Sequence, residues 1–393
     1  MRCTTCDSEN NELLWSNLKK DSPRHKSQPL DVLICKDCGL VFLDLTGLSE
    51  ETLFDYYSNT NTFEKPGPLP EGHKALRDHQ VNWALEQLPN GVKPKSFLDV
   101  GCGAGYISNL YKQLSDDVMG TDLSHAMIAN LKDLYGIDGK QGPFSADLVN
   151  RKFDFISCIT VLEHMYDPKE EILEMKKCIN EDGFLFIEVP DAEFPRSDTI
   201  VDHLAFDHLW HFTVGTLSRL MERCGFKILG TFQRLNSLNS GNPEATFRVV
   251  GQLCSEPFEK EYQKNYYEAE KLALAKYKDD HNLYLDSFQD KLDKIQAKIG
   301  DEAVAIFPGG EHTGTLLERF DFSKFNIVNI YDNDPAVTGK KFFGINIRHG
   351  SEAALDETRH YLLSTTNHEK SICEQLKSKK PDVKVYGLYN ELD

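Results

Sequence analysis

Between residues 96 and 250, short apolar runs alternate with segments in which apolar residues recur every three or four positions. The helical spacing is clear at Leu123, Met127 and Leu131. The short runs predict buried strands, and the longer spacing predicts amphipathic helices. Repeated strand–helix units of this kind form an α/β fold with a doubly wound parallel sheet, which binds its ligand at the carboxyl ends of the strands. We expect strands at residues 96–100, 117–121, 152–159 and 183–189, and a further pair at 227–232 and 245–251.

A charged helical segment follows, over residues 256–300. Its apolar residues recur at three- and four-residue spacing, which predicts one stripe on a long helix. They are Leu285, Phe288, Leu292, Ile295 and Ile299. A linker helix packing across domains is the favoured interpretation, and a coiled-coil dimer is the alternative. The protein is therefore expected to be a monomer or a homodimer.

The strand–helix pattern begins again after residue 300. Strands are expected at 303–307 and 327–332, and the glycine-rich turn at 308–314 should lead into a helix over 315–320. This predicts a second Rossmann-like unit, although its turn lacks the complete dinucleotide fingerprint. Glu311 and His312 in this turn have no obvious packing role, which makes them candidate substrate contacts. The predicted domains are residues 1–48, 49–255, 256–300 and 301–393.

Composition and charge narrow the class of partner. The 393-residue chain carries a net charge of −18, which disfavours a nucleic-acid partner because neutralising phosphates needs a basic face. No apolar run approaches the ~20 residues of a membrane span. The first residues form no apolar signal-peptide core, so we expect a cytoplasmic protein with no membrane partner. A small-molecule substrate fits this acidic net charge best.

Four of the ten cysteines form two Cys-x-x-Cys pairs near the N-terminus: Cys3 with Cys6, and Cys35 with Cys38. Each pair can turn two thiolates toward one tetrahedral ion. We expect a structural Zn²⁺ in an N-terminal zinc ribbon, because four thiolates leave no open coordination position. An unmetallated hairpin or a redox pair is the alternative.

The strand at 96–100 runs into the turn Asp99-Val100-Gly101-Cys102-Gly103-Ala104-Gly105, and the next strand ends at Asp122. Closely spaced glycines suit positive φ and close approach of a ligand to the backbone. An acid about 20 residues later sits where a ribose diol would bind. This pattern resembles motif I of class I S-adenosylmethionine (SAM) methyltransferases more than the G-x-G-x-x-G of NAD enzymes. The resemblance implies that SAM is bound by Asp99, Gly101, Gly103 and Asp122. Asp147, before the next strand, is expected near the adenine amino group. A Rossmann-like fold without a ligand is the alternative.

Two later segments supply candidate catalytic groups. His164 follows the strand at 152–159, so it should emerge above the methyl donor, although it could instead serve a helix start. Residues 190–212 contain three histidines and several acids. Of these we favour Asp207 and His208 as substrate-facing, since an imidazole oriented by a carboxylate accepts a proton well. A second metal site, or capping and packing before Thr213, is the alternative.

Taken together, these features resemble a bacterial family of SAM-dependent methyltransferases with a zinc ribbon, a Rossmann-like methyltransferase fold and a C-terminal Rossmann-like domain. Its best understood members are nucleotide-sugar C-methyltransferases. In them a Tyr-x-Glu-His stretch, with an earlier histidine, handles proton abstraction beside a keto group. The matching residues here are 205–208, with Asp207 in place of the glutamate and no tyrosine, and His164 as the earlier histidine. The N-terminal tyrosine of the family corresponds to Tyr57, with Tyr56 as the alternative, and Tyr57 is the candidate substrate contact.

The resemblance implies SAM-dependent C- or O-methylation of a sugar or nucleotide-linked small molecule in bacterial sugar, polysaccharide or natural-product biosynthesis. His208 would be the base, with Asp207 orienting it. Two alternatives remain: an RNA methyltransferase whose zinc ribbon contacts RNA, and a non-catalytic scaffold that binds SAM and zinc.

Overall fold

The computed structural model divides into two compact units. Unit 1 comprises residues 1–18, 29–196 and 204–276, and unit 2 comprises residues 19–28, 197–203 and 277–393. The structure describes residues 1–18, 21–22, 25–26, 30–52, 54, 71–89, 91–200, 204, 208–234, 245–254, 265–335, 337–342, 344–366 and 368–392. Tyr57 and Asp207 lie outside these described residues. The boundaries of the four predicted domains remain predictions.

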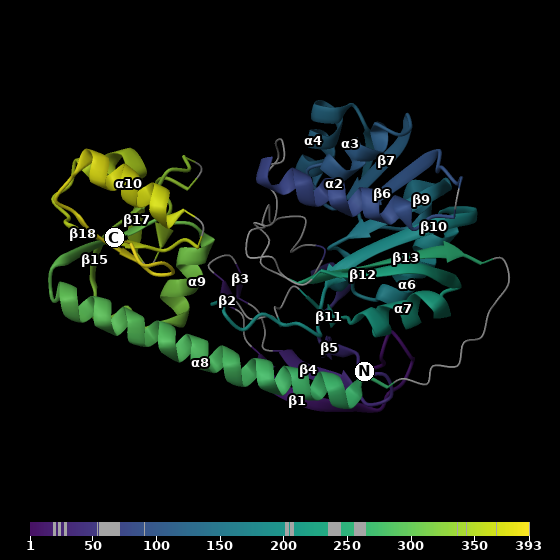
Figure 1. The fold of residues 1–393 in the computed structure, drawn as a ribbon, viewed down its shortest axis with the longest axis horizontal. Coiled ribbons are helices and arrows are strands. Elements are labelled where there is room, and N and C mark those ends of the chain that lie inside the picture. The colour runs from purple at the N-terminus through teal and green to yellow at the C-terminus, as the bar shows by residue number, and fades with distance from the viewer. Residues whose placement is uncertain are drawn as a thin grey trace. The chain divides into compact units, whose positions relative to one another are not determined.

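A seven-stranded sheet forms the centre of unit 1, in the order β8–β7–β6–β9–β10–β13–β12 (Figure 1). Its strands are β6 (Ser96–Val100), β7 (Asp117–Asp122), β8 (Asp138–Gln141), β9 (Phe153–Ile159), β10 (Ile179–Pro190), β12 (Phe226–Arg234) and β13 (Thr246–Leu253). The first five run parallel, and β13 is antiparallel to both of its neighbours. Numbered along the chain, the order is 3-2-1-4-5-7-6. The predicted α/β fold is confirmed.

Helices cover both faces of this sheet, because its central strands are apolar on both faces. They are α2 (Glu71–Glu86), α3 (Tyr106–Lys112), α4 (His125–Tyr135), α5 (Ala146–Val149), α6 (Pro168–Lys177) and α7 (Val214–Arg223), with the 3₁₀ turn η1 (Leu162–His164). Phe97, Phe155 and Phe186 pack with residues of α2 and α3. Their alternating neighbours Leu98 and Ile156 pack in a different core, which includes residues of α6 and α7. The two-residue period of the strands thus divides the apolar side chains between two layers.

A four-stranded sheet contains the N-terminal cysteine segment, in the order β1–β4–β5–β11. Its strands are β1 (Asn11–Leu18), β4 (Leu30–Cys35), β5 (Val41–Leu43) and β11 (Trp210–His211). The first three come from the N-terminus, but β11 comes from the histidine-rich segment that precedes α7. Residues of this sheet share one core with the seven-stranded sheet. The cysteine segment is therefore completed by a strand from much later in the chain.

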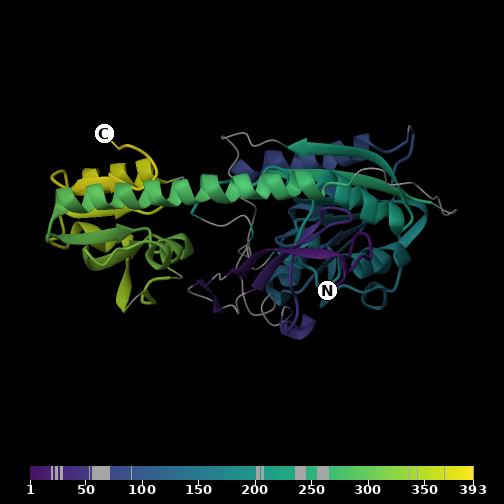
Figure 2. The same cartoon turned by 90° about the horizontal axis from the view of Figure 1, so that it is seen from below.

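The charged segment forms a single long helix, α8 (Tyr267–Ile299), which Figure 2 shows as one continuous ribbon. The predicted stripe lies on it: Phe288, Leu292, Ile295 and Ile299 are buried in the core of unit 2, and Leu285 packs against them. Residues 255–264 lie outside the described part of the chain. The prediction of a long helix with one buried stripe is thus met where the chain is described.

Unit 2 contains a second mostly parallel sheet, in the order β16–β17–β15–β14–β18–β19. Its elements are β14 (Ala303–Phe307), α9 (Glu311–Arg319), β15 (Asn326–Asp332), β16 (Lys341–Phe342), β17 (Ile345–His349), η2 (Gly350–Ala354), β18 (His360–Leu363), α10 (Glu369–Lys379) and β19 (Lys384–Gly387). A two-stranded ribbon of β2 (Asp21–Ser22) and β3 (His25–Lys26) belongs to the same unit. The second Rossmann-like unit is confirmed, with one correction. Helix α9 begins at Glu311, four residues before the predicted start, so Glu311 and His312 lie in its first turn.

Within the described ranges, no helix combines the length and apolar character that crossing a bilayer requires.

Candidate active site

The glycine turn after β6 forms one wall of a cavity in unit 1. Gly101 and Gly103 have φ of +68° and +48°, a region that side chains rarely adopt. A Cβ on Gly101 would also lie 2.3 Å from the Cγ2 of Val161. Glycine is therefore required at position 101 both for the backbone conformation and for the close approach of the segment after β9.

Two carboxylates are held rigidly beside this turn. Asp99 is buried, and its oxygens accept hydrogen bonds from the Ser157 hydroxyl at 2.8 Å and the Ser108 hydroxyl at 2.7 Å. Asp122, at the end of β7, accepts the N–H of Gly103 at 2.9 Å and the N–H of Ser124 at 2.8 Å. Both acids are thereby fixed at the carboxyl edge of the sheet, where a doubly wound fold binds its ligand.

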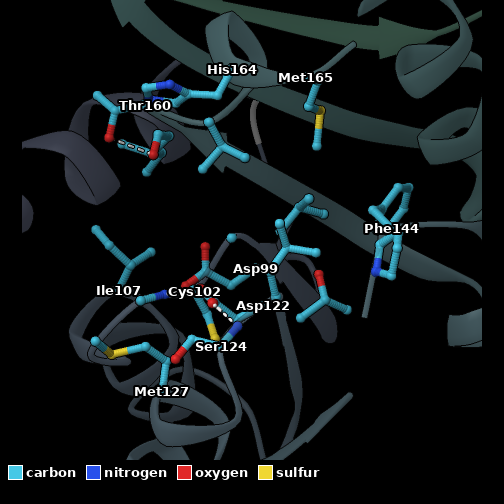
Figure 3. A pocket seen from close by; sticks show the side chains of 18 of the residues that line it. Asp99, Cys102, Ile107, Asp122, Ser124, Met127, Phe144, Thr160, His164 and Met165 are labelled. Carbon is cyan, nitrogen blue, oxygen red and sulfur yellow. Dashed lines mark hydrogen bonds between the residues drawn. The ribbon is translucent and has the colours of Figure 1, made fainter. Parts of the chain in front are cut away.

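The cavity has a volume of about 420 Å³. This lies within the range of roughly 300–1,000 Å³ typical of small-molecule sites. Figure 3 shows Asp99, Cys102 and Asp122 along one side, with His164 and Met165 across the cavity from them. Phe144 stands at a third side. An acidic, glycine-lined wall thus faces a wall that contains an imidazole.

Five predicted site residues line this cavity: Asp99, Gly101, Gly103, Asp122 and His164. Asp147 is not among its lining residues. It is exposed in the first turn of α5, and the nearby wall consists of residues 142–144. Its contact with adenine stays a prediction.

The two candidate catalytic histidines, His164 and His208, lie next to each other. Their ring centroids are 4.8 Å apart, in an edge-to-face arrangement. The Nε2 of His164 is 3.7 Å from a carboxylate oxygen of buried Glu163. Ligating atoms of Glu163, His164 and His208 all fall within 4.8 Å of one another. Of these three residues His164 lines the cavity, whereas Glu163 and His208 are not among its lining residues.

The position of His208 depends on backbone hydrogen bonds to two other elements. The N–H of Leu209 donates to the carbonyl of Glu163 at 2.8 Å, and the carbonyl of Leu209 accepts the N–H of Leu43 at 2.9 Å. The strand β11 then pairs with β5, matching Trp210 with Phe42. The Trp210 indole N–H also donates to the carbonyl of Met165 at 2.9 Å. The cysteine-bearing sheet and the segment of η1 therefore both hold the two residues that follow His208.

Thr160 marks where β9 leaves the sheet and the chain turns toward His164. Its φ is +53°, an uncommon conformation for a β-branched residue. Its hydroxyl donates to the carbonyl of Ile159 at 2.7 Å, and its N–H donates to the carbonyl of Glu188 at 2.7 Å. Strained residues cluster at functional sites, and Thr160 lines the cavity. No local sequence pattern predicts a strained residue at position 160.

Glu171 in α6 is a second lining residue that sequence reasoning missed. Its Oε2 is buried, and none of the described residues provides it with a hydrogen-bond partner. Burial, followed by the nearby carboxylate of Glu50, raises the pKa of Glu171 to about 8. Glu50 lines the same cavity. This end of the cavity favours a cation or a hydrogen-bond donor.

The four N-terminal cysteines converge as predicted. The Sγ atoms of Cys3 and Cys38 are 3.5 Å apart, and those of Cys6 and Cys35 are 3.4 Å apart. All four lie within 4.8 Å of one another. Tetrahedral Zn–S bonds of about 2.3 Å place sulfur atoms about 3.8 Å apart, so the four thiols fit one zinc ion.

His312, a predicted substrate contact, lies in unit 2. Its Nε2 shares a hydrogen bond with the Tyr389 hydroxyl, and burial lowers its pKa to about 4. It is therefore neutral at pH 7. Its role in substrate binding stays a prediction, as does that of Glu311.

Comparison with known proteins agrees with this site. Residues 75–230 match the family model described as "Methyltransferase domain". The chain is 30% identical over 115 residues to the ubiquinone biosynthesis O-methyltransferase of Pseudomonas paraeruginosa, a match that covers 28% of this chain and 49% of that protein. It is 25% identical over 174 residues to a probable S-adenosylmethionine-dependent methyltransferase of Mycolicibacterium smegmatis, covering 42% of this chain and 65% of that protein. The chain thus spans about half of the first relative's length and just under two thirds of the second's.

Among solved structures, the magnesium protoporphyrin IX methyltransferase of Synechocystis PCC 6803 with bound SAH is similar at a TM-score of 0.36 and 16% identity. The aligned region covers 48% of this chain and 90% of the Synechocystis chain. Unit 1 thus contains a region that matches a methyltransferase domain model, and its strand order 3-2-1-4-5-7-6 and glycine turn with two carboxylates form a Rossmann-like methyltransferase fold.

Proposed function

We propose that the protein transfers a methyl group from SAM to a sugar or nucleotide-linked small molecule. The observation that carries this proposal is the cavity itself, in which Asp99 and Asp122 lie on one side and His164, in contact with His208, on the other. The proposal keeps both C- and O-methylation open, since a base at this position suits a carbon acid or a hydroxyl.

SAM would be held by the turn after β6. Asp122 ends the second strand in chain order, where an acid accepts hydrogen bonds from a ribose diol. Asp99 provides a carboxylate at the cavity wall, and the glycines leave the backbone open to close approach by a ligand. SAM supplies a methyl group that is already electrophilic, so the protein needs to align the acceptor and remove a proton.

His208 is the proposed base, and His164 its neighbour at the cavity wall. A neutral imidazole accepts a proton near pH 7. The neighbouring groups of the cluster of Glu163, His164 and His208 would then stabilise the protonated imidazole. The predicted orienting role of Asp207 and the substrate role of Tyr57 concern residues outside the described ones, and both stay proposals.

Zn²⁺ in the Cys3, Cys6, Cys35 and Cys38 cluster is proposed to be structural. Four thiolates close the coordination sphere, and the sulfur separations fit it. The ion would rigidify the sheet that carries β5, and through β5 the strand next to His208.

The test compares His208→Ala with His125→Ala, an exposed histidine of α4. Radiolabelled SAM and a panel of nucleotide sugars measure transfer, and calorimetry measures SAM affinity. We expect His208→Ala to lower transfer by roughly 10²- to 10⁴-fold, the usual contribution of a general base, with SAM affinity unchanged within a few-fold. Wild-type turnover in this variant would remove the base assignment, and absence of SAM binding in the wild type would refute the proposed function.

A further inference from the structure

Glu163, His164 and His208 form a group of metal-ligating side chains separate from the four cysteines. Within the part of the chain that the structure describes, these are the two groups whose ligating atoms converge, and here those atoms all lie within 4.8 Å of one another. The Nε2 of His164 is 3.7 Å from a carboxylate oxygen of Glu163. Tetrahedral bonds of about 2.1 Å place two such atoms roughly 3.4 Å apart, so small side-chain rotations bring the three groups to one ion.

The backbone holds the segments that carry these ligands together. Glu163 and His164 are consecutive residues of η1, so this turn fixes their separation. His208 comes from a distant segment, but the next residue, Leu209, donates its N–H to the carbonyl of Glu163 at 2.8 Å. The ligand set therefore exists before an ion binds, which lowers the entropic cost of binding.

Burial and access both favour a cation at this cluster. Glu163 exposes only 1% of its surface, and a buried carboxylate is costly unless a positive charge compensates it. His208 is half-buried, and His164 lines the cavity (Figure 3). An ion can therefore reach the cluster from the cavity, through the side on which His164 lies.

The ligand atoms determine which metals fit. Imidazole suits zinc, copper, iron and nickel, whereas Mg²⁺ and Ca²⁺ prefer oxygen ligands. Two imidazoles and one carboxylate are a common ligand set of zinc sites that keep a fourth coordination position open. This cluster thus differs from the four cysteines, which would close the coordination sphere of their ion.

We propose that Glu163, His164 and His208 bind a second zinc ion, and that this ion inhibits methyl transfer. A neutral imidazole has one nitrogen lone pair, because its other nitrogen carries a proton. A metal ligand and a general base use this same lone pair. Zinc on His208 therefore removes the proposed base. The inhibition rests on the proposed function, whereas the metal site itself does not.

Metal binding is measured first, on the full-length protein. The protein is stripped of metal, reloaded with one equivalent of Zn²⁺ and titrated with further Zn²⁺ in a calorimeter. Co²⁺ in place of Zn²⁺ identifies the ligands, because thiolates give sulfur-to-cobalt charge-transfer bands and imidazoles do not. We expect a second ion to bind without adding to these bands, and Mg²⁺ not to bind at the same concentrations.

Three single variants locate the second ion. Glu163→Gln, His164→Ala and His208→Ala each remove one ligand, and each should weaken the second zinc ion by about ten-fold or more. Glu170→Gln and His125→Ala remove an exposed carboxylate and an exposed imidazole outside the cluster, so they should bind zinc like the wild type. Unchanged charge-transfer bands of the first cobalt ion would show that each variant is folded around its four cysteines.

Methyl transfer is then measured at rising zinc concentration. In the wild type, transfer should fall to half at the concentration that half-fills the second site, with the affinity for S-adenosylhomocysteine unchanged within a few-fold. Glu163→Gln keeps both imidazoles. Relative to this variant's own activity without added zinc, its midpoint of inhibition should rise by the same factor by which its zinc affinity falls.

Four results would overturn parts of this inference. Absence of a second ion in the wild type, or wild-type zinc affinity in all three cluster variants, would overturn the site. Equal affinity for Mg²⁺ and Zn²⁺ would overturn the class of metal. Unchanged or increased transfer with the second site filled would overturn the inhibition. A protein that binds the second ion at this cluster but transfers no methyl group without it would keep the metal site and refute the proposed function together with the inhibition, so the two proposals fail distinguishably.

Discussion

Removing the proposed zinc ion should disable the proposed base His208 while leaving the proposed SAM binding almost intact. The perturbation is chelation of the wild type, or Cys6→Ser, which replaces one of the four converging thiols. Of the two backbone hydrogen bonds made by Leu209, one goes to Glu163 and the other comes from Leu43 in the cysteine-bearing sheet. Loosening that sheet removes the second support and leaves the first.

The size of the effect follows from this geometry. Displacing a catalytic group by about 1 Å costs on the order of 10²-fold in rate, and losing a general base costs at most about 10⁴-fold. We therefore expect transfer to fall by roughly 10²-fold or more. Asp99 and Asp122 belong to β6 and β7 in the centre of the other sheet, so SAM affinity should change by less than about three-fold.

The assay combines single-turnover transfer with calorimetric SAM binding, on metal-free and zinc-reloaded protein. Cys254→Ser is the matched control, since Cys254 is half-buried and lies outside the four-thiol cluster. Full transfer by folded, metal-free protein would refute the reasoning. Loss of SAM affinity in parallel with transfer would show instead that the metal supports the whole of unit 1.

Two further predictions concern buried charges. Because burial raises the pKa of Glu171 to about 8, the native state binds an extra proton between pH 4.5 and 8, and stability should fall as pH rises through that window. In thermal melts Glu171→Gln should flatten this slope, whereas exposed Glu170→Gln should keep it; an unchanged slope in Glu171→Gln would contradict the assignment. Arg248, fully buried, donates to Glu188 at 2.5 Å, so Arg248→Met should cost about 3–5 kcal/mol in urea unfolding. The double variant Arg248→Met with Glu188→Gln should recover much of this loss. If Arg248→Met and the double variant were equally stable, this would argue against a buried, unpaired charge on Glu188.

The elements that the sequence predicts well are those whose signals are local. The strands at 96–100 and 303–307 match their predicted bounds because an apolar run bounded by glycine turns specifies a buried strand. Each Cys-x-x-Cys pair is a local turn, whereas the pairing of β1 with β4 brings the two pairs together. The predicted start of α9 is four residues too late, because the sequence pattern assigns Gly314 to a turn although this glycine lies inside the helix.

The rest of the site depends on contacts between distant segments. The place of His208 is set by the pairing of Trp210 with Phe42, which no local pattern encodes. The pKa of Glu171 reflects burial at the cavity wall beside Glu50, which periodicity cannot reveal. Sequence patterns thus identify the elements, and long-range pairing decides which side chains meet.

The pairing of β5 with β11 also has a consequence for how the protein is made. During synthesis β5 is complete long before residues 210–211 leave the ribosome, so its edge stays open in the meantime. This edge consists of three apolar residues, all buried in the finished protein. An open apolar edge invites pairing with other chains, and a short strand limits that risk. An isolated fragment of residues 1–48 would keep this edge open permanently, and it should be more prone to aggregate than the full chain.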